Sequence, residues 1–216
     1  MSELLIGDII ARLNKSCLDK IGLDIGANHG SYTPLIAKQC MKTYAFEPNL
    51  ENFRTLMENV KDENVIFVNG AVGTENGLIK LWTCRSNPGG HTISPAIANA
   101  TVYDHDPNRF KMVQSVSLDN YFGDTTNIGF IKIDVEGAEE FVLRGASKIL
   151  DNNKIIIALE THQTINRDSI YNYMSDKGYV ILDQDYKVVP KQSFTYDQHY
   201  LLHNHADLDE FLVSEG

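Results

Sequence analysis

Short apolar runs alternate with segments of helical periodicity from residue 20 onwards, and this alternation limits the possible folds more than any other feature. Three runs in the first third of the chain are expected to be strands: 20–25, 43–46 and 64–68. We expect a helix at 48–60, opened by Pro48, because the first helical position does not need an N–H group. Strand–helix alternation with short joints is typical of a parallel sheet with helices on both faces.

Apolar periodicity predicts the other elements in the same way. Further strands are expected at 78–83, 113–118, 128–137, 154–160, 179–183 and 199–203, and further helices at 3–14, 31–40, 138–150 and 168–177. The last two strands are expected to be adjacent. The sequence therefore predicts an α/β fold with a sheet of about seven strands, mostly parallel, with the last strand antiparallel. We expect a single domain over 1–216, with a leading helix within 1–19.

Charge and composition narrow the class of partner. The chain has 19 lysine and arginine residues against 29 aspartate and glutamate residues, a formal net charge of −10. So acidic a surface repels the phosphates of DNA and RNA, and we expect no nucleic-acid partner. The N-terminus has no basic region, and no apolar run reaches the about 18 residues of a membrane span. Cys17, Cys40 and Cys84 lack metal-binding spacing and fit reduced thiols, so we expect a cytoplasmic protein without membrane contact.

The loop after the first predicted strand carries the strongest motif, LDIGANHG at 23–30. Gly26 and Gly30 let the backbone turn tightly and approach a ligand closely. The loop resembles the dinucleotide-binding pattern G-x-G-x-x-G, but Asn28 replaces the middle glycine and Asp24 would repel a pyrophosphate. A carboxylate suits a ligand with a cationic end. S-adenosylmethionine is such a ligand, because it carries an ammonium and a sulfonium and no phosphate.

An acid also ends the second predicted strand, in the string Phe46-Glu47-Pro48. A carboxylate in this position can accept hydrogen bonds from both hydroxyls of a ribose. Because dinucleotide binders and S-adenosylmethionine binders both use such an acid, Glu47 by itself does not separate them.

Three charged residues alternate in the run IKIDVEG at 131–137. Strand alternation puts Lys132, Asp134 and Glu136 on one side if the strand runs that far. Charges in an inner strand are costly unless they are paired or used, and open α/β sheets bind ligands at the carboxyl ends of their strands. A structural Lys132–Asp134 salt bridge and a role at a reaction centre are both compatible with this pattern.

The strings DIGANHG, FEP and IKIDVEGAEEFVLRGA together resemble the FkbM family of S-adenosylmethionine-dependent methyltransferases, from about residue 20 to about residue 183. The resemblance implies the Rossmann-like class I methyltransferase fold and O-methylation of a hydroxyl on a small molecule or sugar. It implies a cofactor site, completed by the neighbouring motif residues, at Asp24, Gly26, Ala27, Asn28, Gly30, Glu47, Pro48, Ala71 and Asp134. It also places Lys132, Asp134 and Glu136 near the reaction centre. Ala71 stands where the family contacts the adenine, although Gly73-Thr74 follows it in place of the usual Ser-Asp pair.

Other catalytic candidates come from strand ends and loops. Glu160 and His162 lie at the end of a predicted strand, and His91 lies in the loop 84–101, which is too long for a plain connector. Transfer to a hydroxyl benefits from a proton acceptor, and histidine is the usual one near neutral pH. A surface or hydrogen-bonded imidazole is the alternative interpretation of each histidine.

The C-terminal histidines raise the question of a metal site. His199, His203 and His205 have no nearby acids or cysteines in the sequence. We therefore expect a solvated or packed strand there and no metal.

The predicted site is one cleft at the carboxyl edge of the sheet, with the cofactor across the first three strands and the acceptor beside the fourth. Lys132, Asp134, Glu160 and His162 should line it together with the glycine loop. His91 should reach the cleft only if its loop folds over it as a lid.

Three other functions are weighed against this one. An NAD-dependent oxidoreductase is disfavoured by Asp24 and Asn28. A cofactor-binding module without catalysis is disfavoured by the charged residues at 132–136. Methylation of nucleic-acid amines is disfavoured because Asp-Val-Glu-Gly at 134–137 stands where such enzymes carry an Asp/Asn-Pro-Pro-Tyr string.

Overall fold

The computed structural model describes residues 3–13, 17–84, 87, 89–99, 105–162 and 167–204. Its main sheet has seven strands: β1 (Ile21–Ile25), β2 (Lys42–Phe46), β3 (Val65–Val68), β7 (Ile128–Ile133), β8 (Ile156–Thr161), β9 (Val180–Leu182) and β10 (Gln198–His203). The helices around this sheet are α1 (Glu3–Arg12), α2 (Thr33–Gln39), α3 (Leu50–Asn59), α5 (Leu118–Phe122), α6 (Glu139–Arg144), α7 (Ser147–Asn152) and α8 (Arg167–Asp176). A short 3₁₀ helix, Lys191–Ser193, precedes β10.

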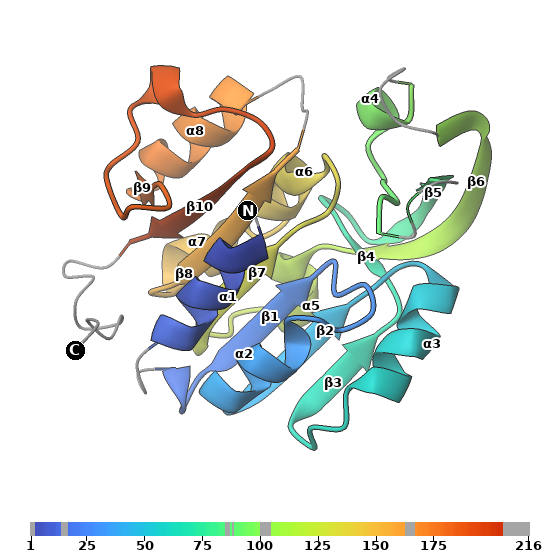
Figure 1. The fold of residues 1–216 in the computed structure, drawn as a ribbon, viewed down its shortest axis with the longest axis horizontal. Coiled ribbons are helices and arrows are strands. Elements are labelled where there is room, and N and C mark those ends of the chain that lie inside the picture. The colour runs from blue at the N-terminus through green and yellow to red at the C-terminus, as the bar shows by residue number, and fades with distance from the viewer. Residues whose placement is uncertain are drawn as a thin grey trace.

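The strand order is β3-β2-β1-β7-β8-β10-β9 (Figure 1). Neighbouring strands from β3 to β8 are parallel, whereas β10 is antiparallel to both β8 and β9. This confirms the predicted fold class and the adjacency of the last two strands. The chain leaves β1 in one direction and β7 in the other, so a switch point lies between these strands, where α/β sheets bind ligands.

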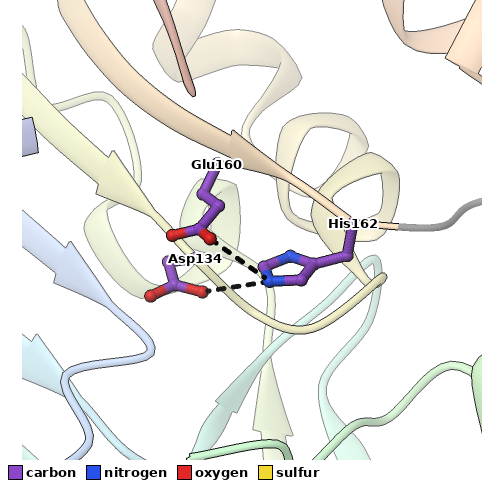
Figure 2. A group of neighbouring side chains, drawn as sticks. All are labelled: Asp134, Glu160 and His162. Carbon is purple, nitrogen blue, oxygen red and sulfur yellow. Dashed lines mark ion pairs between the residues drawn. The ribbon is translucent and has the colours of Figure 1, made fainter. Parts of the chain in front are cut away.

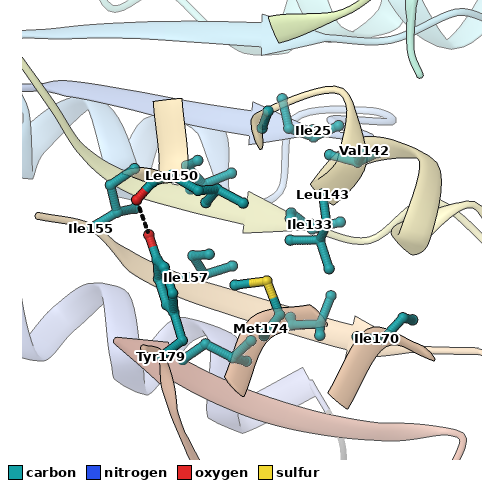
Figure 3. Packing of buried hydrophobic residues seen from close by; sticks show 14 of the residues in the cluster. Ile25, Ile133, Val142, Leu143, Leu150, Ile155, Ile157, Ile170, Met174 and Tyr179 are labelled. Carbon is teal, nitrogen blue, oxygen red and sulfur yellow. Dashed lines mark hydrogen bonds between the residues drawn. The ribbon is translucent and has the colours of Figure 1, made fainter. Parts of the chain in front are cut away.

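Buried aliphatic side chains attach the helices to both faces of the sheet. On one face, α1 and α2 pack with Phe130, Ile156 and Ala158, and α3 packs beside them on β2. On the other face, α6, α7 and α8 pack over β1, β7 and β8 in the larger core cluster (Figure 3). The Tyr179 hydroxyl in this core donates to the Leu150 carbonyl at 3.3 Å, which satisfies a buried polar group.

A second sheet of three strands stands beyond the carboxyl ends of β1, β2 and β3 (Figure 1). It consists of β4 (Ala71–Val72), β5 (Gly77–Cys84) and β6 (His105–Val116), and the short helix α4 (Pro95–Ala98) lies between β5 and β6 in sequence. The sequence predicted most of β5 and the end of β6 but not a separate sheet. It also missed residues 105–112 of β6, where Asp106, Pro107 and Asn108 have low strand propensity.

Three predicted boundaries were wrong. The helix predicted at 138–150 is two helices, because the Gly145 carbonyl accepts from the Asp119 N–H at 2.9 Å and the Ile149 N–H donates to Asp119 Oδ1 at 3.1 Å in place of a helical bond. Helix α3 begins after Pro48, and the side chain of Asn49 caps it by accepting from the Glu51 N–H at 2.9 Å. Strand β7 ends at Ile133, so Asp134 and Glu136 lie in a loop, where Glu136 has a φ of 53°.

None of the helices in the described part of the chain is both long and apolar enough to cross a bilayer.

Candidate active site

A cavity of about 770 Å³ opens at the switch point between β1 and β7. Its wall combines the glycine loop, the ends of β2, β7 and β8, the second sheet and the middle of α1. The lining residues predicted from sequence are Gly26, Ala27, Asn28, Glu47, Pro48, Ala71, His91, Lys132, Asp134, Glu136 and Glu160. A cavity of this size is typical of small-molecule and cofactor sites.

The glycine loop passes very close to the end of β7. Gly26 has a φ of 77°, and an added Cβ would lie 1.9 Å from the carbonyl oxygen of Asp134. The N–H groups of Gly26 and Ala27 both donate to the Phe46 carbonyl, at 3.1 and 2.9 Å. Gly30 has a φ of 89° and faces Leu56 and Val60 rather than the cavity. Gly26 therefore shapes the cavity wall, whereas Gly30 allows the turn to pack on α3.

Asp24 and Lys132 form a buried ion pair beneath this loop. Their side chains are 1% and 2% exposed, and Lys132 Nζ lies 3.3 Å from Asp24 Oδ1. Lys132 also donates to the Gly26 carbonyl at 2.7 Å, and Thr33 donates to Asp24 Oδ2 at 2.6 Å. Burial lowers the pKa of Lys132, but the Asp24 and Asp134 charges outweigh it and hold the pKa above its ordinary value. The ammonium is therefore charged and supports the loop.

These contacts change the roles that the sequence suggested. Asp24 is not on the cavity wall, so its carboxylate is placed to hold Lys132 rather than the cationic end of a ligand. Lys132 does line the cavity, but its ammonium already contacts Asp24, the Gly26 carbonyl and, at 3.5 Å, Asp134 Oδ2. The Lys132–Asp134 salt bridge is therefore present at the cavity wall, and a role of these residues at a reaction centre stays a prediction.

Glu47 has the position expected of a ribose-binding acid. Its Oε2 accepts from the Asn28 N–H at 2.9 Å and its Oε1 accepts from the Asn49 N–H at 2.8 Å. Burial raises the pKa of Glu47 to about 7, against the opposing effect of these two hydrogen bonds. Each oxygen keeps a further lone pair for a hydroxyl donor, so two adjacent hydroxyls fit this carboxylate.

Asn28 offers an acceptor that the protein does not use. Its Oδ1 is buried and, among the described residues, has no hydrogen-bond partner. The residue lines the cavity in the left-handed conformation, with a φ of 49°. An unsatisfied buried acceptor costs about 1–3 kcal/mol, so a donor group of a bound ligand would be stabilised there. Asn28 and Glu47 therefore give the cavity wall acceptors for hydrogen-bond donors of a ligand.

The described part of the loop 84–101 closes one side of the cavity. The residues of this loop that line the cavity are Asn87, Gly89, His91 and Ile93. His91 was predicted to reach the cavity only if the loop folds over it, and His91 does line the cavity. Residues 85, 86, 88, 100 and 101 of this loop lie outside the described residues. The Nδ1 of His91 accepts from the Cys84 N–H at 3.2 Å, so its neutral form carries the proton on Nε2. In this tautomer Nε2 is a hydrogen-bond donor rather than a proton acceptor.

An acidic group surrounds His162 at the ends of β7 and β8 (Figure 2). The Nδ1 of His162 lies 2.8 Å from Glu139 Oε1. Its Nε2 faces Glu136 Oε2 at 3.5 Å, Glu160 Oε1 at 3.7 Å and Asp134 Oδ1 at 3.8 Å. Burial lowers the pKa of His162, but the Glu139 hydrogen bond and the other carboxylates raise it to about 10. A histidine in this state is protonated near neutral pH, which argues against the general-base role suggested by the sequence.

The pKa values of two carboxylates in this group are also shifted. Burial raises the pKa of Glu136 to about 7, with His162 opposing the shift and the neighbouring carboxylates adding to it. Burial also raises the pKa of Glu160, but the hydrogen bond and charge of His199 outweigh it and hold the pKa below its ordinary value.

The structure brings Lys132, Asp134 and Glu160 onto one wall with Gly26, as predicted. It places His162 just behind that wall, 9% exposed. Sequence reasoning missed Glu139, because its carboxylate turns inward from the first position of α6 to reach His162. It also missed the pairing of His199 with Glu160 at 3.0 Å, which antiparallel pairing of β10 with β8 creates. His199 and His203 are packed rather than solvated, and His205 lies outside the described residues.

Comparison with known proteins agrees with this geometry. The family model of the methyltransferase FkbM domain matches residues 24–181. Methyltransferase 1 of Beauveria bassiana is 28% identical over 145 residues, which are 59% of this chain and 58% of that protein. The hexuronic acid methyltransferase AglP of Haloferax volcanii is 26% identical over 160 residues, 73% of this chain and 62% of that protein. The chain thus spans less than two thirds of the length of either relative.

Solved structures share the fold at low sequence identity. Methyltransferase FkbM from Methylobacillus flagellatus has a TM-score of 0.52 and 16% identity, covering 86% of this chain and 43% of that chain. An rRNA methylase from Streptococcus thermophilus has a TM-score of 0.51 and 13% identity, covering 94% and 95%. SMU.1697c from Streptococcus mutans, solved in complex with S-adenosylhomocysteine (SAH), has a TM-score of 0.52 and 12% identity, covering 94% and 97%. These likenesses show the class I methyltransferase fold. Because one neighbour is an rRNA methylase, the absence of a nucleic-acid partner stays a prediction.

Proposed function

This chain belongs to the FkbM methyltransferase family, and from this premise we propose that it transfers a methyl group from S-adenosylmethionine to a hydroxyl of a small metabolite or sugar. The observation that carries the proposal is that one continuous cavity lies at the switch point. Its lining joins the glycine loop and Glu47 to the carboxylates after β7 and β8, so a cofactor and an acceptor can lie next to each other.

The cofactor part of the cavity is formed by Gly26, Asn28, Glu47 and Ala71 in this proposal. Glu47 would accept the two ribose hydroxyls, and the unused Asn28 Oδ1 would accept from a donor group of the cofactor. Ala71 and Val72 supply an apolar wall at which the adenine fits. When bound, S-adenosylmethionine supplies an electrophilic methyl group.

The acceptor part is formed by Asp134, Glu136 and Glu160. Carboxylates accept hydrogen bonds from hydroxyl groups, which suits a polyhydroxylated acceptor, and they repel the phosphates of a nucleic acid. Holding the acceptor oxygen in line with the methyl–sulfur bond can contribute about 7–11 kcal/mol. Glu136 lines the cavity and would take the hydroxyl proton as the new oxygen–carbon bond forms. The relative AglP is a hexuronic acid methyltransferase, which supports a sugar acceptor.

Two measurements test the proposal. Calorimetry should show that SAH binds and NAD does not. Methyl transfer from labelled S-adenosylmethionine should then be assayed on neutral sugars, hexuronic acids and RNA, with label expected on a sugar hydroxyl. NAD binding without SAH binding would favour an oxidoreductase. SAH binding without transfer to any acceptor would favour a cofactor-binding module, and label on RNA would refute the acceptor class.

A further inference from the structure

Three potential metal-ligand atoms converge at the cavity wall, from two neighbouring strands. Asp134 Oδ1, Glu160 Oε1 and His162 Nε2 all lie within 4.8 Å of one another (Figure 2). The Nε2 of His162 is 3.7 Å from the Glu160 oxygen and 3.8 Å from the Asp134 oxygen. These separations are too long for hydrogen bonds and leave room for an ion between the three atoms.

The fold fixes this convergence. Strands β7 and β8 pair in parallel, with Ile133 opposite Leu159, so Asp134 follows β7 at the level of Glu160. Residues two apart on a strand project to the same side. Glu160 and His162 therefore project together from the end of β8, toward the loop that carries Asp134.

A separate partner holds the far side of each of the three side chains. Glu139 Oε1 contacts His162 Nδ1 at 2.8 Å, and His199 Nε2 contacts Glu160 Oε2 at 3.0 Å. Lys132 Nζ lies 3.5 Å from Asp134 Oδ2. Each contact leaves the other atom of the side chain, Nε2, Oε1 or Oδ1, facing the shared space. Metal-binding histidines and carboxylates are oriented by such outer contacts, and a carboxylate is one of the usual partners of the far nitrogen of a histidine ligand.

We propose that Asp134, Glu160 and His162 bind a divalent first-row metal ion at the wall of the cavity. Two carboxylate oxygens and one imidazole nitrogen are a ligand set for ions such as Mn²⁺ or Zn²⁺. Binding of the ion displaces the Nε2 proton that His162 carries in the free protein. Asp134 and Glu160 line the cavity, so the remaining coordination positions face it. One of them can take an acceptor oxygen, a consequence that rests on the proposed function, whereas binding of the ion does not.

The test uses the full chain freed of metal with a chelator and titrated with Mn²⁺. The signal of free Mn²⁺ in electron paramagnetic resonance measures the bound fraction. We expect one Mn²⁺ per chain in the wild type and at least about tenfold weaker binding in E160Q and D134N. The outer-contact variant E139Q should weaken binding about 10- to 100-fold. E51Q is the matched control, because Glu51 is 79% exposed and pairs with Lys111, and its affinity should equal that of the wild type.

The outcomes separate this inference from the proposed function. No bound Mn²⁺, or equal binding in the wild type and E160Q, overturns the metal site. Zn²⁺ should displace the bound Mn²⁺ because nitrogen–oxygen sites prefer it, and failure to do so would count against a histidine ligand. SAH binding and thermal unfolding without metal are measured on every variant, so a misfolded variant is recognised. SAH binding without Mn²⁺ binding refutes only the metal site, and the reverse result refutes only the cofactor site.

Discussion

The most demanding packing in the candidate site is the contact between Gly26 and Asp134, and the substitution Gly26→Ala tests it. A Cβ on Gly26 would lie 1.9 Å from the Asp134 carbonyl oxygen and 3.0 Å from its carbonyl carbon. Both atoms belong to the backbone, so no side-chain rotation can relieve the overlap. The loop and the end of β7 must therefore move apart.

The expected loss of stability has two parts. Placing alanine at a φ of 77° costs about 1–2 kcal/mol, because a Cβ is unfavourable in the left-handed region. Overpacking against a backbone that must shift costs about a further 1–3 kcal/mol. The free energy of unfolding should therefore fall by about 2–5 kcal/mol.

Gly178→Ala isolates the first part. Gly178 has a φ of 79°, but an added Cβ would have no atom within 4 Å. The free energy of unfolding of Gly178→Ala should fall by only about 1–2 kcal/mol, the cost of the backbone conformation. Urea unfolding measures both variants, and calorimetry measures SAH binding, which Gly26→Ala should weaken and Gly178→Ala should leave unchanged. Equal losses of stability in the two variants, with SAH binding intact in Gly26→Ala, would refute the argument from close packing.

Three other predictions concern the buried charges. Glu47→Gln should weaken SAH binding by about 1.5–3 kcal/mol, because it removes a charged acceptor; calorimetry checks this, with Glu51→Gln as the exposed control. Wild-type SAH affinity should fall about tenfold from pH 8 to pH 6, because a carboxyl with a pKa of about 7 gains a proton as the pH falls and then accepts the ribose hydroxyls less well. Lys132→Met should lower the free energy of unfolding by about 3–5 kcal/mol, because Asp24 then stays buried without its partner, and adding Asp24→Asn should restore part of the loss in urea unfolding.

Each of these has a result that contradicts it. An unchanged SAH affinity in Glu47→Gln would show that the Glu47 carboxylate has a structural role and does not bind the ribose. A pH dependence that persists in Glu47→Gln would assign the titration to another group. The same raised pKa of Glu47 has an effect on stability. Because the pKa is raised from 4.5 to about 7 in the folded protein, the free energy of unfolding should fall as the pH rises toward 7. A loss in Lys132→Met that Asp24→Asn does not reduce would show that packing, rather than charge, is the cause.

Local sequence determined the outline of the fold. The glycine loop, Glu47 and the run at 131–137 each follow an apolar strand, and parallel strands present their carboxyl ends at one edge. The position of these motifs along the chain was therefore enough to predict that Gly26, Glu47 and Asp134 meet at one site. Strand–helix alternation likewise predicted the layers, because its periodicity is a local property.

Tertiary contacts decided what each side chain does there. Asp24 and Lys132 became a buried pair because β1 and β7 place them in register, although they are 108 positions apart. The single helix predicted at 138–150 is interrupted at Gly145, because the Gly145 carbonyl accepts from the N–H of the distant Asp119. The grouping of Asp134, Glu160 and His162, with Glu139 and His199 behind them, depends on the ends of β7 and β8, the helix α6 and the antiparallel strand β10 packing at once. Sequence spacing carries no record of such long-range contacts, because their energy depends on distances that only the folded chain sets.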